Sequence, residues 1–120
     1  MGGVVTYADA MKRDWLGVPK KVLAQHGAVS AEVALAMAQG VRRACGATVG
    51  LAITGIAGPG GGTAEKPVGL VFLALAAPGS HSVRQLQLGQ RREWNRPYAC
   101  LLALDMLRRH ELHVAHGAPE

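Results

Sequence analysis

The chain is poor in aromatic residues, with two tryptophans, two tyrosines and one phenylalanine among 120 residues. Its core must therefore be built from Ala, Val, Leu, Ile and Met, with glycines that let neighbouring elements approach closely. The basic residues come in short pairs, such as Arg42-Arg43 and Arg91-Arg92, without aromatic side chains between them to stack on bases. The net charge of +5 favours an anionic partner, but this pattern argues against nucleic acid.

Cysteines and long apolar runs are also scarce. Cys45 and Cys100 are too few for a disulfide framework, and the apolar helical patterns around them predict buried, reduced thiols. The longest apolar run, residues 68–77, is well short of the roughly 18 residues that suggest a membrane span. Residues 1–3 do not open a signal peptide. We therefore expect a cytoplasmic protein without a membrane partner.

The apolar residues that are present predict strands. They make up 49% of the chain, against 18% charged residues, so a single folded domain is expected. Residues 49–54 and 68–77 are nearly continuous apolar runs, typical of strands covered on both faces. The imperfect alternation over 82–88 predicts a strand nearer the sheet edge, and the β-branched segment 3–7 predicts a further strand. Helices must lie on both sides of such a sheet.

Capping residues delimit the expected helices, which cover residues 9–16, 19–25, 30–45 and 92–109. Ser30 is well placed as an N-cap and Gly46 as a C-terminal stop. Pro97 should kink or restart the last helix, because it removes a backbone hydrogen bond. We expect one α/β domain over residues 1–112, followed by a flexible tail at 113–120.

A glycine-rich loop separates the two apolar strands, running from Gly55 to Pro67. Its backbone N–H groups, unshielded by side chains, are suited to an oxyanion or a phosphate, and Lys66 would add a positive charge. The alternative is a mobile connector, although a connector needs only one or two glycines to turn. The loop lacks the Gly-Lys-Ser or Gly-Lys-Thr of a phosphate-binding P-loop. A strand follows it where a dinucleotide fingerprint demands a helix.

Histidines in the carboxy-terminal region are candidate metal ligands by residue type alone. His110, His113 and His116 are spaced three residues apart, so they drift around a helix and lack the His-Glu-x-x-His spacing. We predict neither a metal site nor a cofactor.

Four segments together resemble one family. The run 55–69 resembles the signature loop of the CinA carboxy-terminal family, and two more segments, residues 3–12 followed by 16–18 and residues 25–34, agree with the family in the same order. The segment Arg92–Arg96 resembles the family's paired arginines. The resemblance implies a three-layer α/β/α sandwich with a mixed sheet. It also implies hydrolysis of the carboxamide of nicotinamide mononucleotide to nicotinate mononucleotide and ammonia, a step of pyridine-nucleotide salvage.

The resemblance assigns roles to particular residues. A serine attacks the amide carbon, and Tyr7 and Lys12 match activating and proton-transferring groups beside it; a lysine with a lowered pKa can act in this way. Taken alone, Tyr7 is typical of a half-buried aromatic residue and Lys12 of a surface residue. Arg92 and Arg96, one helical turn apart, face either a phosphate or the solvent. The predicted substrate-binding residues are Thr54, Gly55, Ala57, Gly58, Gly60, Gly61, Gly62, Thr63, Lys66, Arg92 and Arg96.

The sequence departs from the family pattern at its beginning. The family's nucleophile lies in a Glu-Ser-x-Thr-Gly-Gly motif upstream of the tyrosine, whereas this sequence opens at the strand 3–7. We therefore expect an amino-terminally truncated domain that lacks its first strand, the nucleophile turn and a helix. The exposed sheet edge would favour a homo-oligomer. Asp9, where the family usually has asparagine, could raise the pKa of Lys12.

Three functional hypotheses follow from this. The first is an amide hydrolase of nicotinamide mononucleotide. The second is a noncatalytic nucleotide-binding or structural remnant without the serine nucleophile. The third, a basic nucleic-acid-binding module, rests on the net charge and requires steeply salt-dependent DNA binding.

Overall fold

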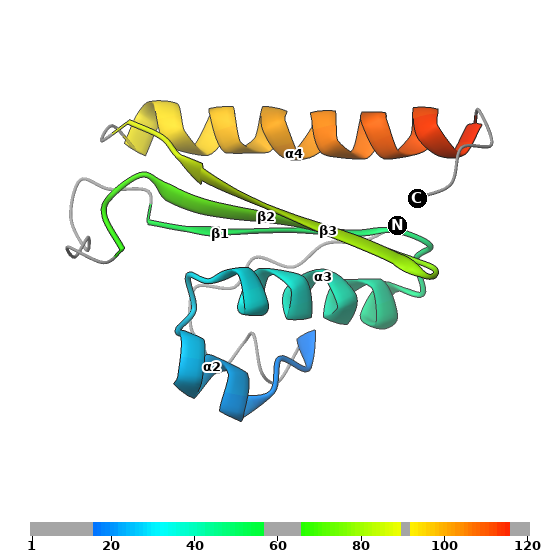
Figure 1. Cartoon of the computed structure of the whole chain (residues 1–120), viewed down its shortest axis with the longest axis horizontal. Helices are drawn as coiled ribbons and strands as arrows, with labels where there is room; N and C mark the ends of the chain where they lie inside the picture. The colour runs from blue at the N-terminus through cyan, green and yellow to red at the C-terminus, as the bar shows by residue number, and fades with distance from the viewer. Residues whose placement is uncertain (1–15, 57–65, 90–91, 116–120) are drawn as a thin grey trace.

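A computed structural model describes residues 16–56, 66–89 and 92–115. Figure 1 shows three layers, with one long helix on one face of a sheet and two shorter helices on the other. The predicted α/β/α layering is therefore confirmed. In chain order the elements are α2 (Lys20–His26), α3 (Ala31–Cys45), β1 (Gly50–Gly55), β2 (Leu70–Ala77), β3 (Ser80–Gln87) and α4 (Arg92–Ala115).

The described strands form one sheet in the order β1-β2-β3, and both neighbouring pairs are antiparallel. The three strands expected over 49–54, 68–77 and 82–88 are all present. A mixed sheet is not seen among these strands, because both of their pairs are antiparallel. The strand predicted at 3–7 lies outside the described residues.

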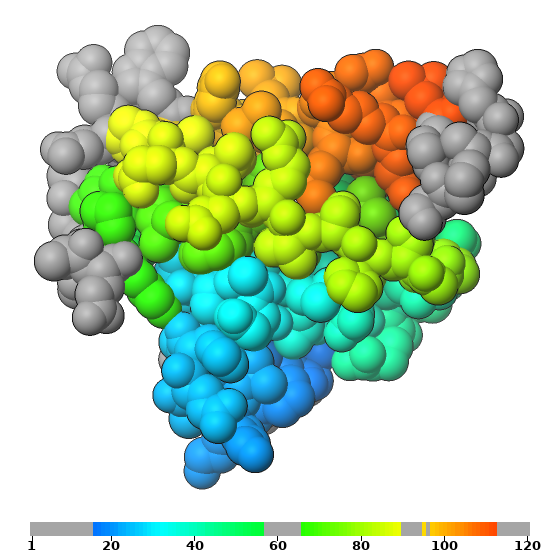
Figure 2. Space-filling view, viewed as in Figure 1, coloured from blue at the N-terminus to red at the C-terminus, as the bar shows by residue number. Residues whose placement is uncertain are grey.

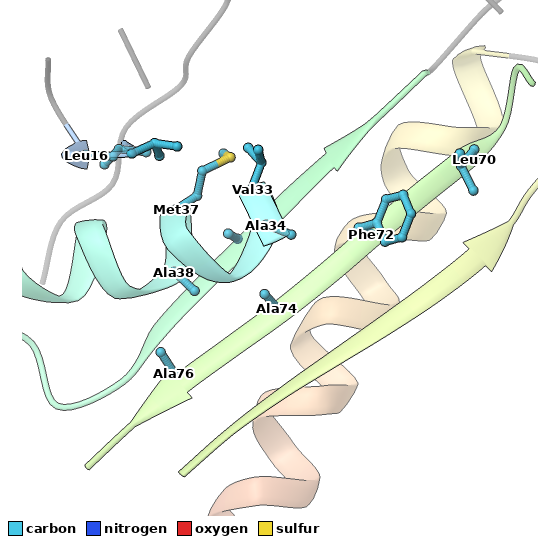
Figure 3. Packing of buried hydrophobic residues seen from close by; sticks show 11 residues of the cluster. Leu16, Val33, Ala34, Met37, Ala38, Leu70, Phe72, Ala74 and Ala76 are labelled. Atoms are coloured by element: carbon cyan, nitrogen blue, oxygen red, sulfur yellow. The ribbon is translucent and has the colours of Figure 1, made fainter. Parts of the chain in front are cut away.

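The central strand β2 is buried on both faces along its whole length, as its continuous apolar run predicts. Alternate residues of β2 face opposite helix layers, so the strand contributes to two separate cores. Figure 3 shows the core on the α3 side, where Phe72 and Ala74 of β2 pack with Val33 and Met37 of α3. On the α4 side, Leu73 is fully buried. Burial of such a leucine contributes about 1.5–3 kcal/mol.

Helix α3 begins and ends where the sequence predicts. The Ser30 side chain accepts a hydrogen bond from the backbone N–H of Val33 at 3.2 Å, and its hydroxyl donates to the Gly27 carbonyl at 2.8 Å. Gly46 adopts the left-handed conformation that closes the helix. These caps fix the place at which the chain enters and leaves the layer below the sheet.

Helix α4 departs from the prediction at Pro97. The helix neither stops nor restarts there, and it continues to Ala115. Pro97 lies in the second turn with its ring exposed, so only one backbone hydrogen bond, to the Glu93 carbonyl, is lost and the ring displaces no packed group. The helix therefore extends into the range 113–115, which the sequence assigns to a flexible tail; residues 116–120 lie outside the described part.

The two cysteines are free thiols, and the prediction that they are buried is wrong. Cys45 is half-buried and Cys100 is exposed. Cys100 lies on the side of α4 turned away from the sheet. Apolar residues occur around the whole circumference of α4, so the periodicity does not reveal which side is buried. Among the helices in the described ranges, none is long and apolar enough to cross a membrane.

Candidate functional site

Both described ends of the glycine-rich loop lie at one end of the sheet, across the ends of its strands, and we call this end of the sheet the edge. Because the strands are antiparallel, the end of β1, the start of β2 and the end of β3 all meet there. The backbone N–H of Ile56 donates to the Leu70 carbonyl at 3.0 Å, and that of Gly69 donates to the Ile56 carbonyl at 2.7 Å. Leu88 N–H donates to the Gly69 carbonyl at 2.8 Å. The two ends of the loop are thus held together by the sheet.

Two helices begin at this same edge, on opposite faces of the sheet. Figure 1 shows the starts of α3 and α4 at the end of the sheet where β1 ends and β2 begins. A helix carries partial positive charge at its amino-terminal end. An anion placed at this edge would therefore meet favourable electrostatics from both helix layers.

Thr54 joins the end of β1 to the start of α3. Its side chain is buried, at 7% exposure, and its hydroxyl donates a 2.8 Å hydrogen bond to the Ala28 carbonyl in the turn between α2 and α3. The structure therefore gives this predicted substrate-binding residue a positioning contact. Gly55 follows, and a side chain there would contact the Leu70 carbonyl and Val71 at 2.9 Å, so the position admits only glycine without a shift of the strand.

Lys66, at the far end of the loop, also binds near the turn between α2 and α3. Its ammonium donates a 2.6 Å hydrogen bond to the His26 carbonyl at the end of α2, where the helix dipole favours a positive charge. The His26 ring in turn lies 3.5 Å from the Glu32 carboxylate, with both side chains partly exposed. This bond places the Lys66 ammonium at the turn between α2 and α3, on the same side of the sheet as the start of α3.

Two side chains from α4 and β3, for which the sequence analysis makes no prediction, also form hydrogen bonds at this edge. Asn95, in the first turns of α4, is buried at 4% exposure and donates a 2.6 Å hydrogen bond to the Gly89 carbonyl. Gln87 donates to the Val68 carbonyl at 2.8 Å. The available signal is a polar residue on the sheet-facing side of α4, four residues before Ala99 and eight before Ala103, both of which are buried.

The remaining predicted residues divide into two groups. Arg92 and Arg96 belong to the first turns of α4 at this edge, but their side chains are not among those described. The structure thus brings the described part of the loop, Thr54, Lys66 and the start of α4 to one edge. In the described part of the chain, no group of three or more His, Cys, Asp or Glu residues could hold a metal ion. The predicted residues that lie outside the described ranges are Tyr7, Lys12, Ala57, Gly58, Gly60, Gly61, Gly62 and Thr63.

Comparison with known proteins gives consistent matches to one family. Residues 1–110 match the family described as CinA C-terminal domain. The chain is 52% identical to a CinA-like protein from Myxococcus xanthus over 93% of its own length, and 55% identical to one from Desulfovibrio desulfuricans over 98%. It spans only 27% and 30%, respectively, of the length of these two relatives.

Solved structures agree with the sequence matches. The structure of the competence/damage inducible protein CihA from Agrobacterium tumefaciens has a TM-score of 0.84 and 44% identity, with 87% of this chain and 64% of that chain covered. The competence damage-inducible protein A from Klebsiella pneumoniae has a TM-score of 0.87 and 33% identity, with 92% and 69% covered. The fold and the sequence therefore point to the same relatives.

Proposed function

Because the chain belongs to the CinA C-terminal domain family, we propose that it forms the nucleotide-binding part of a hydrolase that acts on nicotinamide mononucleotide. The products would be nicotinate mononucleotide and ammonia. The observation that carries this proposal is the sheet edge at which both ends of the glycine-rich loop are held together between two helix starts. The two curated relatives are named CinA-like proteins, and the two solved structures are named after competence and damage; none of these names specifies a reaction.

The edge suits the anionic phosphate of a mononucleotide. Backbone N–H groups of a glycine-rich loop approach an anion closely because no side chain intervenes. The amino-terminal ends of α3 and α4 add positive potential, and the net charge of +5 attracts an anionic ligand from solution. Lys66 lies at the end of the loop, where its ammonium reaches the His26 carbonyl.

Amide hydrolysis needs a nucleophile, stabilisation of an oxyanion and a proton for the leaving ammonia. In the proposed reaction the amide carbon gains a bond to oxygen, the C–N bond breaks, and water supplies the net oxygen and protons. Loop N–H groups would hold the developing oxyanion. Tyr7 and Lys12 are proposed to transfer protons. The family's serine motif, Glu-Ser-x-Thr-Gly-Gly, does not occur among these 120 residues, so the nucleophile would come from outside them.

The absence of this serine motif from the 120 residues supports a second candidate function, which is binding of the nucleotide without hydrolysis. The two functions are separated by an ammonia-release assay with nicotinamide mononucleotide, run on this chain and on a longer protein that includes a Glu-Ser-x-Thr-Gly-Gly segment. The proposed hydrolase predicts ammonia from the longer protein. Binding by both proteins without ammonia from either would support the noncatalytic function, and an absence of binding by both would contradict each proposal.

A further inference from the structure

Helix α4 carries apolar side chains on its outer side as well as on the side that packs on the sheet. Ala99, Ala103 and Met106 are buried against the sheet. The outer side bears four large, exposed apolar residues, which we call the outer stripe. They are Tyr98 at 54% exposure, Leu101 at 64%, Leu104 at 59% and Leu112 at 47%. A helix with apolar residues on both sides calls for a second partner besides its sheet.

The outer stripe is continuous with a groove. Figure 2 shows β3 beside α4 on one face of the molecule, and a groove of about 820 Å³ lies between them. Leu86 and Leu88 from the β3 side and Leu102 of α4 line it, and its remaining wall includes Tyr98 and Leu101 of the stripe. The exposed apolar surface therefore extends from the outer side of α4 toward the sheet, so it is larger than a single helix face.

Charged residues interrupt the stripe at its middle and restrict what can cover it. Asp105 accepts a hydrogen bond from Arg108 Nη2 at 2.7 Å and forms an ion pair with Arg109, whose Nε lies 2.8 Å from the Asp105 carboxylate. Leu101, Asp105, Arg108 and Leu112 follow one another at spacings of four, three and four residues. This spacing places the four side chains in one row along the helix, as in the contact seam of a coiled coil.

This row can pair with an identical row on a second helix that runs in the opposite direction. If a second α4 lies antiparallel across the first, with the twofold axis between residues 106 and 107, Leu101 of each copy faces Leu112 of the other. Asp105 of each copy then faces Arg108 of the other. A symmetric dimer needs such a reciprocal patch. A parallel arrangement would instead place Asp105 against Asp105 and Arg108 against Arg108, which is unfavourable.

We propose that the outer stripe of α4 is an interface for a second copy of this chain, with the two helices antiparallel. The apolar ends of the row exclude water, and the central charges set the direction and register of the pair. This interface lies on the outer side of α4 and does not depend on the proposed nucleotide reaction.

Cysteine cross-linking tests both whether a second copy of the chain covers the outer stripe and whether the two α4 helices are antiparallel. In a background with Cys45→Ser and Cys100→Ser, we expect an oxidised mixture of Leu101→Cys and Leu112→Cys chains to form a disulfide-linked dimer, and neither variant to do so alone. The two positions are about 16 Å apart along one helix, too far for a bond within a chain. Glu111→Cys in place of Leu112→Cys is the matched control, because its thiol points about 100° away around the helix.

A charge-exchange series gives an independent readout that requires no cysteine. Light scattering should give about twice 12.5 kDa for the wild-type chain. Asp105→Arg and Arg108→Asp should each weaken dimerisation at least tenfold, and the double exchange should restore it to within a few-fold, with helicity checked by circular dichroism.

Three outcomes would overturn the proposal. The first is a wild-type chain that stays monomeric, and the second is self-linking of the Leu101→Cys variant. The third is a longer family protein that is monomeric and in which the thiol introduced by Leu101→Cys resists alkylation, since a segment of that same protein would then cover the stripe.

Discussion

At the scale of single residues, Thr54 shows how a buried polar group can organise the edge. Its hydroxyl bonds to the Ala28 carbonyl across 26 positions of sequence, and this bond ties β1 to the turn before α3. We expect Thr54→Val to destabilise the domain by about 1–3 kcal/mol, because the shape is kept while the carbonyl loses its donor. Thr54→Ser, which keeps the hydroxyl, should cost less. Urea unfolding of the three proteins measures this, and equal stability of Thr54→Val and wild type would contradict the role.

Asp105 supplies a prediction about pH. Hydrogen bonding from Arg108, with the nearby charge of Arg109, lowers the pKa of the Asp105 carboxyl. Its contribution to stability is therefore complete above the ordinary aspartate pKa of about 3.9 and is lost as the pH falls through the lowered value. The difference in melting temperature between wild type and Asp105→Asn should stay constant from neutral pH down to about 5 and shrink below about 4. A difference that grew on acidification would contradict the assignment.

The residue scale is also where sequence-based prediction is least complete. The charge of Lys66 marks it as a candidate, but its bond to the His26 carbonyl depends on how α2 ends, 40 positions earlier in the chain. Asn95 has a signal in its spacing of four and eight residues from Ala99 and Ala103, but apolar residues surround α4, so the sequence does not show that this side is the buried one. Contacts that link distant segments leave no local signature, whereas Ser30 is identified from sequence because its cap lies three residues from its partner.

At the scale of elements, the turn that starts β2 depends on Gly69. This residue has a φ of 90°, and a Cβ atom there would overlap the carbonyl oxygens of Leu88 and Gly89. Gly79 has a φ of 70°, but a Cβ atom there would have nothing within 4 Å. Gly79→Ala should therefore cost about 1 kcal/mol, and Gly69→Ala clearly more. Thermal unfolding compares the two variants, and equal costs would show that the carbonyl contacts at Gly69 are unimportant.

Strands and helix ends are predictable because their signals are local. The apolar run at 68–77 predicts β2 nearly in full, since a continuous run of this length is typical of a strand covered on both faces. Helix α4 is less predictable. Its apolar residues surround the axis, so neither the exposed position of Cys100 nor the uninterrupted passage through Pro97 follows from periodicity.

At the scale of the whole molecule, three strand ends and two helix starts converge on one edge, although they are far apart in sequence. The glycine-rich composition identifies the loop as a candidate. It does not reveal that Thr54 binds the Ala28 carbonyl or that Lys66 binds the His26 carbonyl. The second face of α4 is likewise a property of the assembled domain, because it is exposed only by the way the helix lies on the sheet. Tyr7 and Lys12 remain predictions from the resemblance.

The central claim is that this edge binds a nucleotide through its phosphate. Calorimetric titration of nicotinamide mononucleotide into the chain, compared with nicotinamide riboside, which has no phosphate, tests it most directly. We predict saturable binding of the mononucleotide and binding of the riboside that is weaker by at least tenfold, about 1.4 kcal/mol. Equal affinities for the two compounds, or no heat from either, would contradict the account.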